Sequence, residues 1–179
     1  KIKYFTLAIC LTIFSNIFSQ KGKDGVRTVS VTNTKIIEFT ALTANAATGN
    51  ATITVAASSL NANGRFSSGL SAGDLIMIIQ MQGALIKLSP VPVWAPDSTY
   101  GRVYNYQNCG NYEFAQVKTV ISATQIELEC GLTNNYSISG KTQVVRVPRY
   151  NSLTVTGTGT LTTDAWNGTI GGVLAAEVD

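Results

Sequence analysis

Short segments in which apolar and polar residues alternate place the strongest constraint on the fold of this chain. In TQIELEC, residues 124–130, the side chains of Ile126, Leu128 and Cys130 share one face and polar side chains share the other. This is the pattern of a strand with one buried face. Weaker β-type segments follow at residues 29–31, 36–40, 52–56, 117–121 and 143–147. Clusters of Gly, Asn and Ser separate them and no segment keeps a helical period, so the pattern predicts an all-β fold.

The segment GDLIMIIQMQGALI, residues 73–86, is a long apolar run that contains two glutamines. As a strand, one face would be wholly apolar and the other would turn polar along its length: Leu75, Met77, Ile79 and Met81 on the first, Ile76, Ile78, Gln80 and Gln82 on the second. This predicts a central strand that is covered on both faces at its start. The glutamines then bond to neighbouring backbone, stack in an amide ladder, or face water.

Three regions follow from the composition along the chain. Residues 1–19 begin with Lys1 and Lys3, continue as an apolar stretch and end at a small residue, Ser19. This arrangement predicts a signal peptide cleaved near Ser19–Gln20, and hence a secreted protein. Residues 20–150 are expected to form a β-sandwich-like or irregular β domain. Residues 151–179, with short Thr/Val/Leu segments broken by Gly, predict the start of parallel β-helix-like rungs, in a chain that is part of a longer protein.

The charge of the chain does not suggest a nucleic-acid partner. The full sequence has 13 basic and 10 acidic side chains and a net charge of +3. Two of the basic side chains belong to the predicted signal peptide, so the exported part would carry a net charge of about +1. We therefore expect no binding to nucleic acid.

Two cysteines, Cys109 and Cys130, lie in the part that would be exported. An even pair in an oxidising compartment predicts a disulfide, although two unpaired buried cysteines are the alternative. A reactive thiol is disfavoured, because the nearby charged residues Glu113, Glu127 and Glu129 are acidic.

The sequence offers little for catalysis. It contains no histidine, which excludes a Ser-His-Asp triad and a zinc site that uses histidine. The close carboxylates Glu127 and Glu129 fall on the polar face of one strand, as in an ordinary solvated face. DAWNG, residues 164–168, loosely resembles a calcium loop, but Trp166 stands where an oxygen ligand is needed. We expect no catalytic residue, cofactor or metal.

Residues 89–114 form a segment that is rich in proline and aromatic residues. Three prolines exclude a regular ladder here, which predicts a long structured loop. The aromatic side chains are candidates for stacking on sugar rings: Trp94, Tyr100, Tyr104, Tyr106 and Tyr112. The alternative is that they form a small core of the loop itself. Ser98, in the triplet DST, is a candidate for O-glycosylation because DST resembles the acceptor triplet of exported Bacteroidota proteins.

Five phrases occur together in a characteristic order: GDLIMIIQMQGA, YG, GNYEF, QVVRVPRY and WNGTIGGV. Their order and spacing over residues 73–174 resemble the N-terminal region of very large SprB-type gliding-motility adhesins of flavobacteria. A related arrangement occurs in adventurous-gliding proteins of myxobacteria. The long repeat array and C-terminal sorting domain of such adhesins are not in this sequence.

The resemblance implies a cell-surface adhesin that is exported through the type IX secretion system. Its partners would be the secretion and gliding machinery at the outer membrane and an extracellular surface or glycan. Two alternatives stay open. One is a carbohydrate-binding or β-helical polysaccharide-processing module, and the other is an envelope subunit that donates its apolar strand to the sheet edge of a partner.

Overall fold

The computed structural model describes residues 21–87 and 101–179, and within these ranges it contains fourteen strands and no helix. The strands are β1 (Val26–Val29), β2 (Thr34–Lys35), β3 (Glu38–Ala41), β4 (Thr52–Thr54), β5 (Leu75–Gln80), β6 (Leu85–Ile86), β7 (Val103–Asn105), β8 (Tyr112–Ser122), β9 (Gln125–Leu128), β10 (Thr142–Val147), β11 (Arg149–Tyr150), β12 (Ser152–Val155), β13 (Leu161–Thr162) and β14 (Glu177–Val178). The all-β prediction is confirmed. In the described ranges there is accordingly no helix able to cross a membrane. The predicted signal peptide lies outside the described residues.

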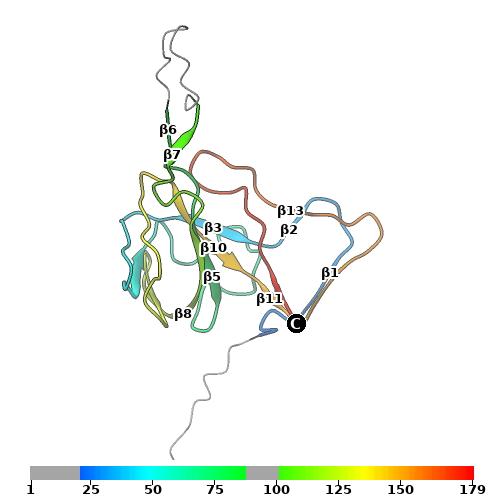
Figure 1. Ribbon diagram of the computed structural model, residues 1–179. Helices are drawn as coiled ribbons and strands as arrows, with labels where there is room; N and C mark the ends of the chain where they lie inside the picture. Colours follow the sequence, from blue (N-terminus) through cyan, green and yellow to red (C-terminus); the bar gives the residue numbers. More distant parts are fainter. Residues whose placement is uncertain (1–20, 88–100) are drawn as a thin grey trace, which may run out of the picture.

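Six strands form one antiparallel sheet in the order β3-β10-β5-β8-β9-β4. Leu42, which follows the edge strand β3, forms an antiparallel bridge with Val55, which follows the edge strand β4. The N–H of Thr43 donates to the carbonyl of Thr54 at 2.9 Å beside this bridge. The sheet thus curls into a barrel closed on itself (Figure 1). One closed sheet replaces the two packed sheets of a sandwich, and the closure covers the sheet edges.

The interior of the barrel is an apolar core built by alternation along its strands. Ile76, Ile78 and Val144 are fully buried in this core, and each buried side chain of this size contributes about 1.5–3 kcal/mol. Ile126 and Leu128 face the same core, as their alternation in β9 predicts. Cys130 was expected on that face but is exposed, because β9 ends at Leu128.

A second apolar core lies on the outer face of β5 and β10. Its buried residues come from β5, β10, β11 and the segment before β3, and partly buried residues of β3, β5 and the C-terminal coil pack against them. The buried residues are Ile36, Ile37, Met77, Val145, Val147 and Tyr150, and the partly buried ones are Phe39, Leu75, Ile79, Leu153, Leu161, Val173 and Ala175. β5 is therefore covered on both faces, and the predicted central strand is confirmed. Met81, expected on its apolar face, follows the end of the strand.

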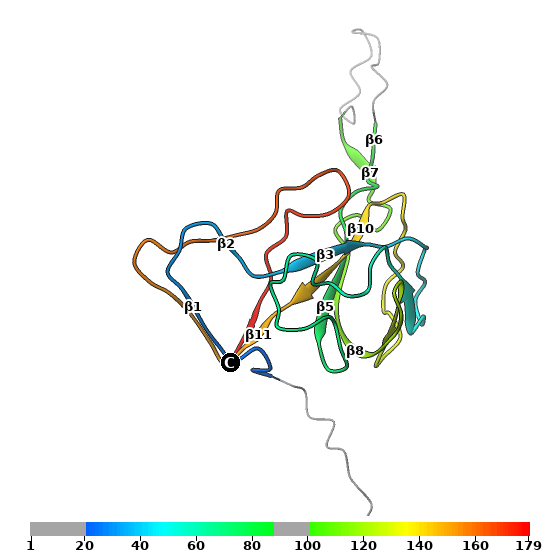
Figure 2. The same cartoon turned by 180° about the vertical axis from the view of Figure 1, so that it is seen from behind.

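The segments that supply this cover run parallel to one another beside the barrel (Figures 1 and 2). β1 pairs with β12, β2 with β13, and β11 with β14, all in parallel. Arg149 pairs with Glu177, so the chain returns to lie beside its earlier course after one coil of 28 residues. Parallel stacking of successive coils is the arrangement of a β-helix. The predicted rungs at the C-terminal end are confirmed, with residues 26–35 as their neighbour on one side.

The loop between β4 and β5 closes one end of the barrel. Arg146 lies two residues after Val144 and so faces the barrel interior at this end. Its guanidinium donates to the carbonyl of Ser68 at 2.8 Å and to the carboxylate of Asp74 at 2.9 Å. It also lies 3.9 Å from the centre of the Phe66 ring. A buried charge held in this way fixes the loop to the barrel.

Candidate glycan-binding surfaces

Four aromatic side chains are exposed between β7 and the start of β8. The exposed fractions are 66% for Tyr104, 67% for Tyr106, 57% for Tyr112 and 53% for Phe114. We call these four residues the aromatic surface. The three tyrosines belong to the residues predicted as glycan contacts, and they are not packed in a core of the loop. The other predicted residues, Trp94, Tyr100 and Ser98, lie outside the described residues.

The chain between the tyrosines is held by Gln80, the last residue of β5. Gln80 is buried, and its Nε2 donates to the carbonyls of Gln82 at 2.9 Å and Gln107 at 2.8 Å. Its Oε1 accepts the backbone N–H of Ser137 at 3.0 Å. Gln80 therefore bonds to neighbouring backbone, which was one of the three alternatives for the glutamines, whereas Gln82 is exposed.

The backbone of the same segment is tightly turned. Gln107 and Asn108 have φ angles of 50° and 63°, in the left-handed region that costs a non-glycine residue about 1 kcal/mol or more. The N–H of Cys109 donates to the carbonyl of Tyr106 at 2.8 Å, and that of Gly110 to the carbonyl of Gln80 at 2.8 Å. These contacts place Tyr106 and Tyr112 on either side of an ordered turn.

Tyr112 and Phe114 point outward from the same face of β8, since alternate residues of a strand share a face. Their rings meet edge to face with centroids 6.2 Å apart, an arrangement favoured for aromatic pairs. Phe114 was absent from the predicted glycan contacts. Its spacing of two residues from Tyr112 in GNYEF is the signal that could have identified it.

Glu113 lies between these two rings in the sequence and points to the opposite side. Its carboxylate accepts the N–H of Thr133 at 2.9 Å and the N–H of Asn134 at 3.1 Å, as well as the hydroxyl of Thr133. Burial alone would raise the pKa of Glu113, but these hydrogen bonds outweigh it and the pKa is lowered. The contacts tie the start of β8 to the loop before β10.

Cys109 and Cys130 are free cysteines, which corrects the predicted disulfide. Cys109 lies beside the end of β5, with its Sγ 3.5 Å from the carbonyl oxygen of Met81. Cys130 follows β9, and β8 runs between β5 and β9 in the sheet. Two strand spacings of about 4.8 Å each exceed the Cα separation of about 7 Å that a disulfide allows.

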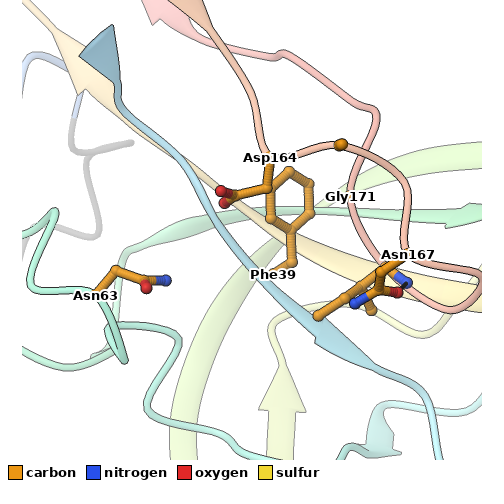
Figure 3. A pocket seen from close by; sticks show the side chains of 7 residues that line it. Phe39, Asn63, Asp164, Asn167 and Gly171 are labelled. Carbon is orange, nitrogen blue, oxygen red and sulfur yellow. Dashed lines mark hydrogen bonds between the residues drawn. The ribbon is translucent and has the colours of Figure 1, made fainter. Parts of the chain in front are cut away.

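A separate pocket lies between the outer face of β3 and the loop at residues 164–171 (Figure 3). Its volume is about 290 Å³, and its lining includes Phe39, Asn63, Asp164, Asn167 and Ile170. Asp164, Ala165 and Asn167 of this lining belong to the motif DAWNG that the sequence analysis considered. Phe39 and Asn63 carry no local signal, because they reach the pocket through strand pairing and loop placement.

Two cations hold the carboxylate of Asp164. Arg65 Nη1 donates to Oδ2 at 2.5 Å, and Lys35 Nζ donates to Oδ1 at 2.6 Å. The hydrogen bond from Arg65 is the largest cause that lowers the pKa of Asp164, to about 2. Asp164 is therefore ionised and neutralised at ordinary pH. Arg65 also lies 3.9 Å from the carboxylate of buried Glu38.

The loop that carries Asp164 is fastened to the barrel by Gln143 of β10. This glutamine is fully buried, and its amide bonds both backbone groups of Gly171. Gly171 has a φ of 105°, and a Cβ there would lie 2.4 Å from the carbonyl oxygen of Ala165. Only glycine fits this close approach of two backbone segments.

The carboxylates considered for catalysis have the surroundings of a solvated surface. Glu127 Oε1 accepts a hydrogen bond from Lys118 at 2.6 Å, and Glu129 is exposed. Residues 21–87 and 101–179 hold no group of three or more His, Cys, Asp or Glu side chains arranged to bind a metal.

Comparisons with known proteins give structural neighbours only. No protein-family model matches the chain, and no curated protein matches it. Solved structures that align with it include three phage tailspikes. The Gp54 tailspike of Acinetobacter baumannii bacteriophage AP22, in complex with A. baumannii capsular saccharide, shares 16% identity over 73% of this chain, with a TM-score of 0.38.

The other two tailspikes are equally distant. Gp61 of Pseudomonas phage phi297 shares 14% identity over 72% of this chain, with a TM-score of 0.37, and gp49 of Pseudomonas phage LKA1 shares 15% over 75%, with a TM-score of 0.35. This chain spans 17%, 22% and 22% of the three tailspike chains. Likeness at this level carries no functional argument.

Proposed function

We propose that this chain is a carbohydrate-binding module. The observation that carries the proposal is the aromatic surface, in which Tyr104, Tyr106, Tyr112 and Phe114 are each more than half exposed within eleven residues of sequence. Exposed aromatic side chains this close together in the chain favour a site of interaction. Aromatic faces suit the C–H faces of sugar rings, and tyrosine hydroxyls suit sugar hydroxyls.

The aromatic surface is ordered before a ligand arrives. Gln80 binds the carbonyl of Gln107 from the barrel, and Glu113 fixes the start of β8 through Thr133 and Asn134. A surface whose backbone is already held by such hydrogen bonds loses little conformational entropy on binding. This supports binding of an extended polysaccharide by stacking, without closure of a loop.

The module would bind without catalysis. Glycoside hydrolysis needs two carboxyl groups across one bond, one of them with a raised pKa so that it can donate a proton. Asp164 is instead held ionised by Arg65 and Lys35, and its pKa is lowered. Glu127 is engaged by Lys118. These surroundings favour a binding role over hydrolysis.

The biological setting we propose is the cell surface, as part of a large exported adhesin of the gliding type. Its support is the resemblance over residues 73–174 and the predicted signal peptide at residues 1–19. The complete reading frame of the gene tests this setting separately from sugar binding. Tandem repeats and a C-terminal sorting domain would support it, and a stop codon shortly after Asp179 would contradict it.

Sugar binding is tested by co-sedimentation with insoluble polysaccharides such as cellulose, chitin and xylan, and by retention on immobilised alginate and dextran. We expect the wild-type protein to be retained by at least one of them. The combined variant Tyr104→Ala, Tyr106→Ala, Tyr112→Ala, Phe114→Ala should lose this retention. Ile121→Ala is the matched control, because Ile121 is 51% exposed on β8 but lies outside the aromatic surface. Equal retention of the combined variant, or none of the wild type on any polysaccharide, contradicts the proposal.

A further inference from the structure

The pocket beside β3 has hydrogen-bonding groups that the protein itself leaves unused. The backbone N–H and Nδ2 of Asn63 donate to the two carboxylate oxygens of Glu38, at 3.0 and 2.9 Å. This fixes the orientation of the Asn63 amide. Its Oδ1 has no hydrogen-bond donor among the described residues. The pocket therefore has a fixed acceptor at this side.

Asn167 supplies the complementary group. Its Oδ1 accepts the backbone N–H groups of Thr169 and Ile170, both at 2.9 Å, in a turn of the loop. The orientation of this amide is thus set as well, and its Nδ2 has no acceptor within residues 21–87 and 101–179. In the view of Figure 3, Asn63 and Asn167 lie on opposite sides of Phe39.

The charges around the pocket are balanced internally. The carboxylate of Asp164 is bound by Lys35 and Arg65, and Arg65 also approaches Glu38. A charged ligand would therefore find no unpaired opposite charge here. The two oxygens of Asp164 still have lone pairs for further hydrogen bonds. What the pocket offers is one aromatic ring, fixed amides and a neutralised carboxylate.

We propose that this pocket binds a single neutral pyranose unit. The ring of Phe39 provides the apolar wall for one face of the sugar. Asn63 Oδ1 accepts from one hydroxyl group, and Asn167 Nδ2 donates to another. The volume of about 290 Å³ is at the small end of ligand pockets, which suits one ring rather than a chain.

This site is distinct from the aromatic surface. The pocket belongs to β3 and the loop at residues 164–171, whereas the aromatic surface belongs to β7 and β8. No residue of the aromatic surface lines the pocket. Either proposal can therefore fail without the other.

The test is a nitrogen-15 NMR titration of the protein with four small probes: methyl β-D-glucopyranoside, methyl β-D-galactopyranoside, methyl α-D-mannopyranoside and N-acetylglucosamine. We expect at least one probe to bind with a Kd in the millimolar range. It should shift the side-chain NH₂ signals of Asn63 and Asn167 in a saturable way.

Two variants separate recognition from folding. Asn167→Asp keeps the Oδ1 acceptor for Thr169 and Ile170 but replaces the free Nδ2 donor with a negatively charged oxygen, so we expect binding to weaken about tenfold. Phe39→Leu keeps apolar volume and removes the flat ring, and should weaken binding about threefold to tenfold. Ile121→Ala, at an exposed position of β8 outside the pocket and outside the aromatic surface, is the control and should bind the probes like the wild type. The proposal is overturned if no probe gives a saturable shift, or if both pocket variants bind the probes with the affinity of the wild type.

Discussion

The side-chain amide of Gln143 bonds both backbone groups of Gly171. Nε2 donates to the carbonyl oxygen at 3.0 Å, and Oε1 accepts the N–H at 2.8 Å. The pair is buried, and it joins a strand of the barrel to the coil that follows it. Because one side chain satisfies both backbone groups of a buried residue, it fixes the position of the pocket loop.

Loss of this contact should destabilise the protein. Gln143→Ala leaves the N–H and the carbonyl of Gly171 without partners, which we expect to lower the free energy of unfolding by about 2–4 kcal/mol. Urea unfolding measures this change, and hydrogen exchange at the Gly171 amide should become faster. Gln125→Ala, at an exposed position of β9, is the control. A change below about 0.5 kcal/mol in Gln143→Ala would show that the contact has no structural role.

The two glutamines of the apolar run should respond differently to the same substitution. Gln80→Leu removes the donor to two carbonyls and the acceptor for Ser137 N–H, and we expect it to cost about 2–4 kcal/mol. Gln82→Leu changes an exposed side chain and should stay within about 0.5 kcal/mol of the wild type. Urea unfolding of the two variants side by side is the measurement. Equal effects would contradict the distinct roles that we assign to them.

The ion pairs of Asp164 should make stability depend on acidic pH. The folded-state pKa of about 2 lies below the ordinary value of 3.8. A lowered carboxyl pKa stabilises the folded state above the unfolded value, and this contribution is lost as pH falls from about 4 to 2. Asp164→Asn should therefore show a shallower fall of the urea midpoint over this range and a lower midpoint at pH 6. Glu129→Gln is the exposed control, and an unchanged profile in Asp164→Asn would count against the ion pairs.

Both thiols should be chemically free. Alkylation of the folded protein without reductant, followed by peptide mass spectrometry, should find the label on Cys130 first, because Cys130 is exposed and Cys109 is half-buried. Full labelling of both is expected after unfolding, again without reductant. A peptide that contains Cys109 linked to Cys130 would restore the predicted disulfide.

Local patterns in the sequence predicted the strands but not their partners. Alternation correctly placed Ile126 and Leu128 in the core, and the run at residues 73–86 correctly indicated a strand covered on both faces. The parallel pairing of β1 with β12 joins segments more than 120 residues apart. No local period encodes such a pairing, because it depends on how the intervening barrel closes.

The candidate sites, like the strands, were predictable only where local sequence determines them. The sequence left two alternatives for Tyr104, Tyr106 and Tyr112, sugar contact or a small core of the loop, and their exposure argues against the second. The pocket was not predictable, because Phe39 and Asn63 meet Asn167 only after the barrel and the coil have formed. The strand order likewise explains why Cys109 and Cys130 are not bonded to each other, since β8 lies between their positions in the sheet.

The central claim is that aromatic rings stack on a polysaccharide. The most direct measurement is affinity electrophoresis in gels that contain a polysaccharide retained by the wild type, with two triple variants at Tyr104, Tyr106 and Tyr112. Substitution of all three by Phe keeps the rings, and we predict a Kd within about threefold of the wild type. Substitution of all three by Leu keeps apolar side chains without rings, and we predict a Kd at least about tenfold weaker. Equal retardation of the Leu and Phe variants would contradict the account.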